Sequence, residues 1–381
     1  MTGAINYDLV VIGLGAFGSA ASYWAARHGV RTLGLERFNL GHGRGASEDH
    51  SRIIRRAYAA PEYVRFIDAA FETWREVEEE SGEQLVFRTG GLDFFPEGCE
   101  DKPEPYEQAL AEEGAAFEKL GFDEIASRWP AWRVPEGIRA FFQAEAGLVA
   151  ASRANSAHRR LATARGADLK ENSEVRSIER VGEGFTVSTG TDTYECGALV
   201  IAADAWMNEM LAPLGVRLNL RIRQEQVAYF DPLDPAAFEP ERFPVWIWHS
   251  DPHAYGIPSF GLPGPKVGLH GAGPDVTGDS RSFEPDPAYA AKVQDFVREH
   301  LPAADGPTLE IRTCLYTLTP DMDLVLDLVP GCKSASLAIG TAHGFKFASA
   351  IGRSLVELAL DGDSAWKLPR FSAERPSLLI T

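Results

Sequence analysis

Hydrophobic and polar positions follow a strand period and then a helix period at the start of the chain. The apolar run YDLVVI at residues 7–12 predicts a short buried strand. The alanine-rich segment SAASYWAARHG at residues 19–29 predicts a helix that Gly29 closes. TLGLE at residues 32–36 predicts a second strand. Strand, helix and strand in this order indicate a βαβ unit of a parallel sheet.

The pattern further along the chain predicts a mixture of helices and strands. Residues 218–320 are rich in strand-like segments and turn residues, and residues 52–58 resemble the basic start of a helix. Helices are expected at residues 63–82, 106–121, 157–165, 288–301 and 349–362, and strands at 86–95, 173–180, 184–190, 198–206 and 336–340.

These elements predict an α/β fold with two interleaved domains. We expect a Rossmann-like nucleotide domain of the glutathione reductase type and an α+β substrate domain built on a mixed sheet. The nucleotide domain is assigned to residues 1–85, 150–215 and 320–381, and the substrate domain to residues 86–149 and 216–319.

Composition excludes several classes of partner. The chain has 381 residues and a formal net charge of -18, so it repels nucleic acid and anionic membrane surfaces. No apolar run is long enough to span a bilayer. The four cysteines show no metal or disulfide spacing, which suits a reducing compartment. We therefore expect a cytoplasmic protein without a bound metal.

A glycine turn follows the first predicted strand directly. Gly13, Gly15 and Gly18 form GxGxxG, and Glu36 ends the second strand 23 residues after Gly13. This context predicts a dinucleotide site, with a pyrophosphate at the helix N-terminus and the ribose hydroxyls on Glu36. Glu36 disfavours NADP but leaves NAD and FAD open. The glycine-rich loop at residues 41–51 is more typical of a flavoprotein.

Three late segments carry a more specific signal. They are CLYTLTPD at residues 314–321, HGFKF at 343–347 and KVGLH at 266–270. Together with the glycine turn and SRIIR at residues 51–55, they make the chain resemble the monomeric sarcosine oxidase and N-methyltryptophan oxidase family over essentially its whole length. The resemblance implies oxidation of a secondary amine by oxygen. The products would be an imine, which water hydrolyses to an aldehyde and an amine, and hydrogen peroxide.

The resemblance also implies roles for individual residues. FAD would be joined to Cys314 through a thioether, with a helix N-terminus near residues 343–346 beside the ring. Lys266 would assist the reaction with oxygen, and Arg55 and Lys346 would bind the substrate carboxylate. Arg52, His270 and Tyr255 are the other candidate catalytic residues, and Tyr316 and Trp246 the other candidate pocket residues. The remaining candidate FAD contacts are Gly13, Gly15, Ala16, Phe17, Gly18, Glu36, Arg37, Ser47, Ser51, Arg52, Val175, His343, Gly344, Phe345 and Lys346.

Other residues depart from the family pattern. Asp204 and Ala342 stand where glycine is expected, Glu48 and Asp49 introduce two acids, and residues 243–248 are heavily aromatic. These departures leave a cyclic imino acid, a bulky N-alkyl amino acid or a glycated amino acid open as the substrate. A dehydrogenase with another electron acceptor also stays open, whereas a non-catalytic redox sensor or a nicotinamide dehydrogenase would not explain the late motifs. The expected partners are a small amine and oxygen, and the resemblance favours a monomer.

Overall fold

A parallel sheet forms around the N-terminal strand of the computed structural model, which describes residues 5–380; the ends of the predicted ranges at residues 1–4 and 381 lie outside it. β1 (Ile5–Ile12) pairs in parallel with β2 (Thr32–Leu35) and with β12 (Thr193–Ile201). Helix α1 (Ala16–Arg27) joins the first two strands, which confirms the expected βαβ unit. The sheet has eight strands, and the others are β9 (Asp168–Lys170), β10 (Ser177–Val181), β11 (Gly184–Ser188), β19 (Val325–Leu328) and β20 (Ala335–Ile339).

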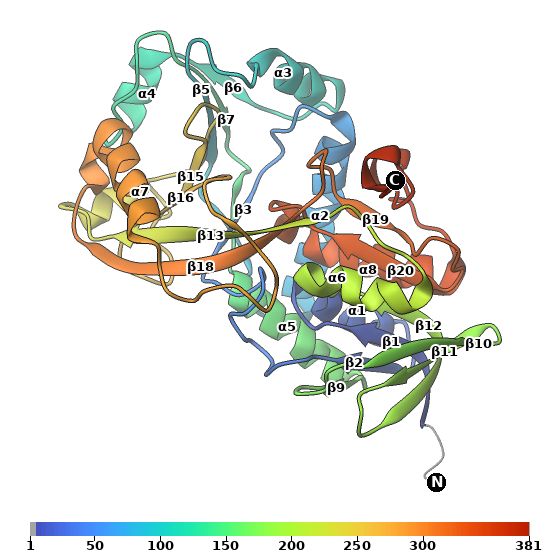
Figure 1. The fold of residues 1–381 in the computed structure, drawn as a ribbon. Coiled ribbons are helices and arrows are strands. Elements are labelled where there is room, and N and C mark those ends of the chain that lie inside the picture. The colour runs from blue at the N-terminus through green and yellow to red at the C-terminus, as the bar shows by residue number, and fades with distance from the viewer. Residues whose placement is uncertain (1–4, 381) are drawn as a thin grey trace.

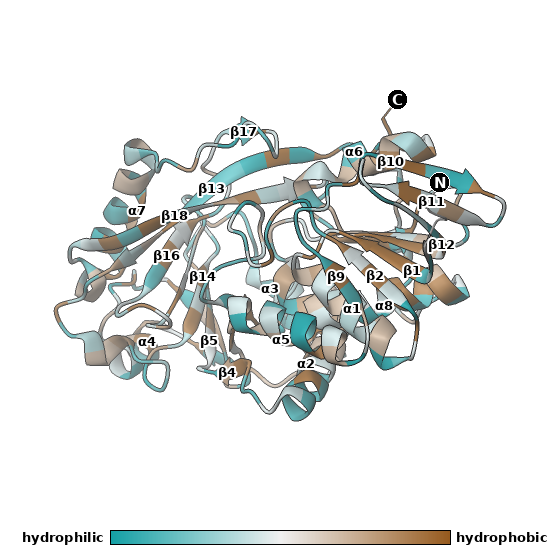
Figure 2. Cartoon of the chain, turned by 90° about the horizontal axis from the view of Figure 1, so that it is seen from below, coloured by the Kyte–Doolittle hydropathy of each residue, from teal (hydrophilic) through white to brown (hydrophobic). Residues whose placement is uncertain are grey.

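Both faces of this sheet are buried, which explains why its central strands are apolar throughout. Leu9 and Val11 pack against one layer of helices, and Val10 and Ile12 pack on the opposite face. The central strands are accordingly the most hydrophobic part of the view in Figure 2. The helical layer consists of α1, α2 (Pro61–Ser81), α5 (Ala151–Ala164) and α8 (Ala348–Asp361), and the opposite face packs against α6 (Met207–Leu211) and the C-terminal segment with Ala373 and Leu378.

A second, mixed sheet of nine strands lies beside the first (Figure 1). Its longest strands, β13 (Arg221–Phe230) and β18 (Thr308–Leu318), pair antiparallel over their whole length and extend toward the first sheet. Helix α7 (Pro287–His300) packs on β13 and β16. The other strands are β5 (Gly91–Phe95), β6 (Glu118–Leu120), β7 (Arg139–Gln143), β14 (Val245–Trp248), β15 (Ala254–Ile257), β16 (Lys266–Leu269) and β17 (Asp275–Val276).

A small three-stranded sheet corrects one prediction. Residues 52–54 form strand β3 (Arg52–Ile54) and do not start a helix. β3 pairs with β8 (Gly147–Val149), with Arg52 opposite Val149, and β4 (Val86–Arg88) pairs on the other side of β8. The pairing partner lies almost a hundred residues away, so the local pattern carries no sign of it.

The predicted helix at residues 106–121 is also partly wrong. Helix α3 (Pro103–Glu112) ends early, β6 pairs with β7, and α4 (Phe122–Arg128) follows. The mixed α/β fold class is confirmed. None of the helices within residues 5–380 has the length and apolar character to cross a membrane. Short 3-10 turns lie at Asp204–Trp206, Ala212–Leu214, Pro235–Phe238, Pro302–Ala304, Gly344–Phe347, Pro369–Phe371 and Pro376–Leu378.

Candidate active site

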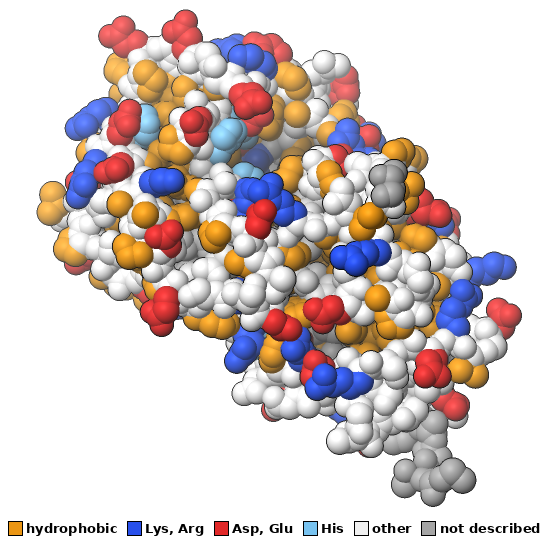
Figure 3. Space-filling view, in the orientation of Figure 1, with side chains coloured by type: hydrophobic (Ala, Val, Ile, Leu, Met, Phe, Trp, Pro, Cys, Tyr) orange, Lys and Arg blue, Asp and Glu red, His pale blue; other side chains and the backbone are white. Residues whose placement is uncertain are grey.

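One cavity of about 880 Å³ connects the glycine turn after β1 with strand β18. Its lining comes from both large sheets, and it also includes the turn at residues 343–346. Figure 3 shows a hollow in the upper half of the molecule where histidine side chains gather beside carboxylates. The cavity therefore brings the early fingerprint and the late motifs into one site.

The glycine turn forms the first end of the cavity. Gly13 has a φ of +87°, and a Cβ there would lie 2.5 Å from the carbonyl oxygen of Ala202. Gly18 does not line the cavity; a Cβ at Gly18 would lie 1.7 Å from the carbonyl oxygen of Gly13, so this glycine allows α1 to pack on the turn. Gly15 caps α1 without a side chain, which leaves the helix N-terminus facing the cavity as an anion site. Gly13, Gly15, Ala16 and Phe17 line the cavity as expected.

Glu36 is buried at the end of β2 and also lines the cavity. It accepts hydrogen bonds from the N–H groups of Leu14 (2.8 Å) and Phe38 (3.0 Å) and lies 3.2 Å from His42 Nε2. Burial raises the pKa of Glu36, but the bonds from His42 and the two N–H groups outweigh it and hold the pKa below its usual value. The carboxylate is therefore ionised and can accept further bonds from a ribose.

Three other candidate contacts surround this end of the cavity. The Ser47 hydroxyl accepts a bond from Ala16 N at 2.9 Å, so the loop at residues 41–51 closes over the start of α1. Arg37 and Val175 line the cavity, and Arg37 pairs with Glu174 at 3.2 Å and Asp279 at 3.0 Å. Ser51 is buried but does not line the cavity. The donors at the helix N-terminus, the buried acid and the cavity itself fit the nucleotide part of FAD.

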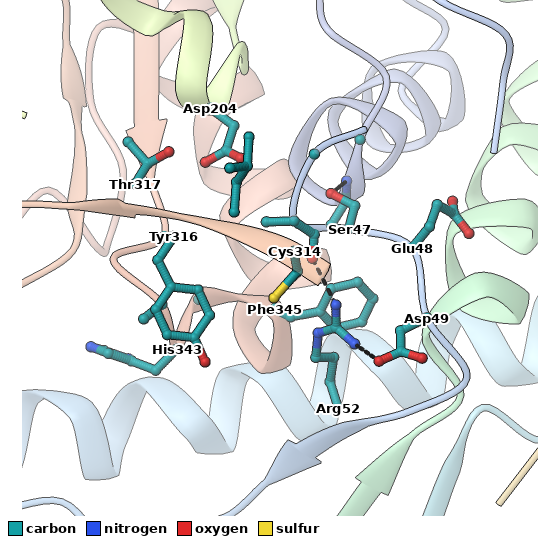
Figure 4. A pocket seen from close by; sticks show the side chains of 18 of the residues that line it. Ser47, Glu48, Asp49, Arg52, Asp204, Cys314, Tyr316, Thr317, His343 and Phe345 are labelled. Atoms are coloured by element: carbon teal, nitrogen blue, oxygen red, sulfur yellow. Dashed lines mark hydrogen bonds and ion pairs between the residues drawn. The ribbon is translucent and has the colours of Figure 1, made fainter. Parts of the chain in front are cut away.

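Cys314 lies inside β18 at the far end of the cavity, and its sulfur points toward Arg52 and Phe345 (Figure 4). Burial raises the pKa of the Cys314 thiol, and the cations of Arg52 and Lys266 lower it in part. Phe345 stacks under Arg52, with the guanidinium carbon 5.8 Å from the ring centroid. The thiol is thus a partly buried group with two cations beside it.

Asp204 and Thr317 face the cavity near Cys314 (Figure 4). Asp204 Oδ2 and Thr317 Oγ1 are buried, and neither has a hydrogen-bond partner within residues 5–380. Burial raises the pKa of the Asp204 carboxyl. Its φ is +45°, which is a backbone conformation that favours glycine. These unpartnered polar atoms are consistent with a ligand in this part of the cavity.

Lys266 begins β16, and its ammonium is buried in an ion pair with Asp49. Lys266 Nζ also donates to the carbonyl of Ser51 at 3.2 Å, and Arg52 donates to Asp49 at 2.9 Å. The pKa of Asp49 is held far below its usual range: burial raises it, but Lys266 and Arg52 lower it more. The expected oxygen-site lysine therefore has a carboxylate partner that the sequence reasoning did not assign.

Arg55 and Lys346 line the same cavity, and both contact Tyr58. The Lys346 ammonium donates to the Tyr58 hydroxyl at 2.9 Å and to the carbonyl of His343 at 2.8 Å. Arg55 stacks on Tyr58, with its guanidinium carbon 4.9 Å from the ring centroid. Arg55 Nη1 lies 3.3 Å from Asp93 Oδ1, yet it is buried without a hydrogen bond to any described residue. Burial, with a contribution from Arg55, puts the pKa of Lys346 well below its usual value.

His343 fixes the direction of the hydrogen bonds around Lys346. Its Nε2 lies 3.2 Å from the carbonyl of Met322, which can only accept, so Nε2 carries the proton. Nδ1 then accepts from the Tyr58 hydroxyl at 3.2 Å. Burial lowers the pKa of His343 to about 3, so the ring is neutral. Two of the three Lys346 protons are used in this chain, and one can bind a ligand.

The candidate pocket residues beyond this point are Tyr255, Tyr316 and His270, and all three line the cavity. The two tyrosine hydroxyls are 3.3 Å apart, and the rings of His270 and Tyr316 are 5.7 Å apart. Burial raises the pKa of both tyrosines and lowers the pKa of His270 to about 4. These groups are therefore neutral hydrogen-bonding partners at pH 7.

Trp246 is not a pocket residue. It is 1% exposed and packs in the core of the second sheet against Trp132 and Phe296. Ile247, the next residue of β14, lines the cavity in its place. A shift of one residue along a strand moves a side chain to the other face, which explains the error.

The cavity also contains polar residues that the sequence did not point to. His249 lies 2.8 Å from Asp93 and 3.2 Å from Asp101, and His253 lies 4.0 Å from Asp101. Tyr58 follows Arg55 by three residues in the chain. No sequence motif includes Tyr58, and none includes Asp93, Asp101, His249 or His253. Within residues 5–380, no cluster of His, Cys, Asp and Glu side chains could hold a metal ion.

Comparison with known proteins agrees with this geometry. The sequence model of the family described as FAD dependent oxidoreductase matches residues 8–358. The chain is 31% identical to monomeric sarcosine oxidase of Arthrobacter sp. over 98% of its own length and 97% of that protein. It is 27% identical to N-methyl-L-tryptophan oxidase of Salmonella arizonae, with 97% and 99% covered. The fold matches the open form of NikD, an amino acid oxidase of nikkomycin biosynthesis, with a TM-score of 0.86, 24% identity and 97% and 98% of the two chains covered.

Proposed function

Because the chain belongs to the FAD dependent oxidoreductase family, we propose that it oxidises a secondary amine that carries a carboxylate, such as sarcosine or another N-methyl amino acid. Oxygen is the electron acceptor in this proposal. The products are an imine, which water hydrolyses to an aldehyde and an amine, and hydrogen peroxide.

The observation that carries the proposal is a pair of basic side chains in the cavity wall, beside which a bound carboxylate would favour the charged form of Lys346. Lys346 has one ammonium proton left for a ligand, and Arg55 has a buried Nη1 without a hydrogen bond to a described residue. A carboxylate accepts charge-assisted bonds from two such donors at once. We therefore assign Arg55 and Lys346 to the substrate carboxylate, with Tyr58 holding Lys346 in place.

When bound, FAD supplies the acceptor for the hydride equivalent that leaves the carbon beside the amine nitrogen. The surrounding residues favour the neutral amine that this reaction requires. His270 is neutral at pH 7 because its pKa is about 4, and the Tyr255 and Tyr316 hydroxyls stay protonated. These groups orient the substrate without adding a charge beside its nitrogen.

The chain offers an attachment point and an oxygen site at the same end of the cavity. We propose that Cys314 carries the flavin through a thioether. Lys266 and Arg52 supply the positive charge that stabilises superoxide as oxygen is reduced. The remaining predicted FAD contacts keep the roles expected for them, apart from Gly18, which allows α1 to pack on the glycine turn, and Ser51, whose carbonyl accepts a bond from Lys266.

The arrangement of the two large sheets supports the proposed division into domains. Strands of the first sheet come from residues 5–35, 168–201 and 325–339, and those of the second from 91–143 and 221–318. We propose that the first set, within residues 1–85, 150–215 and 320–381, holds FAD. Residues 86–149 and 216–319 would then form the substrate domain of a monomeric, cytoplasmic enzyme.

A bulkier or glycated amino acid is the second candidate substrate. The cavity wall also contains the polar residues Asp101, His249 and His253. Such a wall can bind hydroxyl or amine groups that sarcosine lacks. The second candidate for the electron acceptor, which reoxidises the flavin, is a compound other than oxygen.

Anaerobic bleaching of the flavin tests the substrate class. Sarcosine, N-methyl amino acids, proline, pipecolate and glycated amino acids would be added one at a time, and air would then be admitted. We expect bleaching by at least one secondary amino acid and return of the colour in air. A flavin that no compound on this panel bleaches would contradict the proposal, and bleaching without recolouring would favour another acceptor.

The Arg55→Ala variant tests the carboxylate pairing. We expect a KM at least tenfold higher for amino acids, because a charge-assisted bond contributes about 1.5–3 kcal/mol. Amines without a carboxylate should be hardly affected. Arg56→Ala is the matched control, because Arg56 does not line the cavity and pairs with Asp68 at 2.7 Å. An equal loss for both kinds of amine would rule out the pairing.

A further inference from the structure

Asp49 lies at the centre of a buried charged group that the known motifs do not describe. It accepts bonds from Arg52 Nη1 at 2.9 Å and from the Tyr229 hydroxyl at 2.7 Å, and it pairs with Lys266. Arg312 Nη1 lies 3.4 Å away. Only 6% of the Asp49 side chain is exposed. One carboxylate thus connects the loop before β3 with strands β3, β13, β16 and β18.

The charges in this group do not cancel. Arg312 has its own partner, because its Nε lies 2.5 Å from Glu310. Lys266 and Arg52 share Asp49, and no other carboxylate within residues 5–380 lies within 4.0 Å of either cation. Two cations and one anion leave one net positive charge on this wall of the cavity.

Lys266 depends on Asp49 for its proton. The ammonium is 3% exposed, and a buried ammonium without a counter-ion loses its proton readily. Burial lowers the pKa of Lys266 and Arg52 lowers it further, whereas Asp49 raises it. The other titratable or charged groups around the pair are His50 of the same loop, Tyr229 of β13, Tyr255 of β15, and Glu310, Arg312 and Cys314 of β18.

We infer that Asp49 is a positioning residue for the oxygen reaction, which keeps the Lys266 ammonium charged and fixed at the cavity wall beside Arg52. The inference rests on the proposed role of Lys266 with oxygen. In this arrangement the Asp49 carboxylate does more than offset the charge of Lys266, because it also keeps the lysine protonated. Without Asp49, a neutral Lys266 would leave the net charge of the wall unchanged at one positive, but that charge would then lie on Arg52 and no longer on Lys266.

The first test measures the proton on Lys266 and needs neither turnover nor flavin. Acetic anhydride acylates only the neutral amine, and peptide mass spectrometry measures the extent of labelling at Lys266 from pH 6 to 9. In flavin-free protein of a Cys314→Ser background, we expect labelling at pH 7 to be at least tenfold faster for Asp49→Asn than with Asp49 in place, which corresponds to a pKa lower by one unit or more. Asp327→Asn is the matched control, because Asp327 is a buried carboxylate outside the cavity.

The second test measures the reaction of the reduced, loaded enzyme with oxygen. For Asp49→Asn, we expect reoxidation to slow at least tenfold at pH 8 and to recover as the pH falls and Lys266 regains its proton. Protein with Asp49 should show no such recovery between pH 8 and 6. Reduction by the amine substrate should change less than reoxidation.

Three results would overturn the inference. Equal labelling of Lys266 with and without Asp49 would show that the carboxylate does not hold the proton. Faster reoxidation in Asp49→Asn would show that Asp49 weakens the oxygen site. If Asp49→Asn does not fold, labelling of Lys266 in the unsubstituted chain with a midpoint below pH 8 would overturn it equally.

A different result would separate the inference from the proposed function. Faster labelling of Lys266 in Asp49→Asn, with reoxidation as slow in Lys266→Met as in Asp49→Asn at pH 8, would support both. Faster labelling with normal reoxidation in both variants would retain the ion pair and remove Lys266 from the oxygen reaction. The part of the inference that concerns oxygen would then be wrong.

Discussion

At the scale of single residues, the chemistry of Cys314 is set by its neighbours. Cys314 is partly buried, and this desolvation favours the protonated thiol, but Arg52 and Lys266 lie close enough to favour the thiolate. The other three cysteines are buried outside the cavity. Position and charge together therefore distinguish one cysteine of four as a candidate for covalent attachment.

The Cys314→Ser variant should release its flavin. A serine hydroxyl cannot form the thioether, so acid precipitation should leave a colourless pellet and yellow supernatant, whereas the unsubstituted chain should give a yellow pellet. Cys332→Ser is the control, because Cys332 lies outside the cavity and should not affect flavin retention. Flavin that stays bound to Cys314→Ser in acid would contradict the assignment.

At the scale of structural elements, two departures from the family pattern acquire a physical meaning. Asp204 and Ala342 replace glycines of the motifs, and their φ angles are +45° and +70°. Both turns thus keep a backbone conformation that suits glycine, at a cost of about 1 kcal/mol or more each. Asp204 adds a buried carboxyl to this strain.

The Asp204→Asn variant should stabilise the flavin-free protein in a pH-dependent way. Burial raises the pKa of Asp204 in the folded state, so folding favours the protonated form and the free energy of unfolding falls as the pH rises above about 4. Asparagine has no charge to bury. Its advantage should therefore be absent near pH 4 and reach about 1.4 kcal/mol at pH 8 for each unit by which the pKa is raised.

Denaturant unfolding at both pH values, in a Cys314→Ser background, would measure this difference. Ala342→Gly provides the control, since it relieves a positive φ without changing a charge. Its gain should be the same at both pH values. An Asp204→Asn gain that does not change with pH would mean that the carboxyl is not buried in the folded protein.

The elements also show where the sequence is informative and where it is not. The βαβ unit, the C-terminal helix α8 and the hairpin of β10 and β11 were predicted because their periodicity and turn glycines are local. Strands β3 and β6 were missed because their pairing partners, Val149 for Arg52 and Phe142 for Glu118, are distant in the chain. The sequence motifs predicted most of the cavity lining. The roles of Asp49, Asp93 and Tyr58 follow only from their contacts in the structure.

At the scale of the whole molecule, the cavity is shared by the two large sheets. The glycine turn and Glu36 belong to the first sheet, and Lys266 and Cys314 belong to the second. A ligand that contacts all of these residues would hold both parts of the chain together. The stability of the whole chain should therefore depend on flavin occupancy.

Adding FAD to flavin-free Cys314→Ser should raise the melting temperature in a single transition. At a free concentration a thousand times Kd, binding contributes about 4 kcal/mol to the free energy of unfolding. Calorimetry with increasing FAD would measure the shift. Two separate transitions, of which FAD moves only one, would show that the cofactor contacts one sheet alone.

The turn at Gly344–Phe347 has a consequence for how the two ligands influence each other. Its backbone and Phe345 line the cavity near Cys314. Lys346, from the same four residues, lies with Arg55 at the proposed site of the substrate carboxylate. The Lys346 carbonyl accepts a bond from Trp74 Nε1 at 2.8 Å, which ties the turn to α2. If flavin binding shifts this turn, the position of Lys346 at the amine site changes. If amine binding shifts it, the position of Phe345 at the flavin site changes. By thermodynamic reciprocity, if flavin tightens amine binding by some factor, the amine must tighten flavin binding by the same factor.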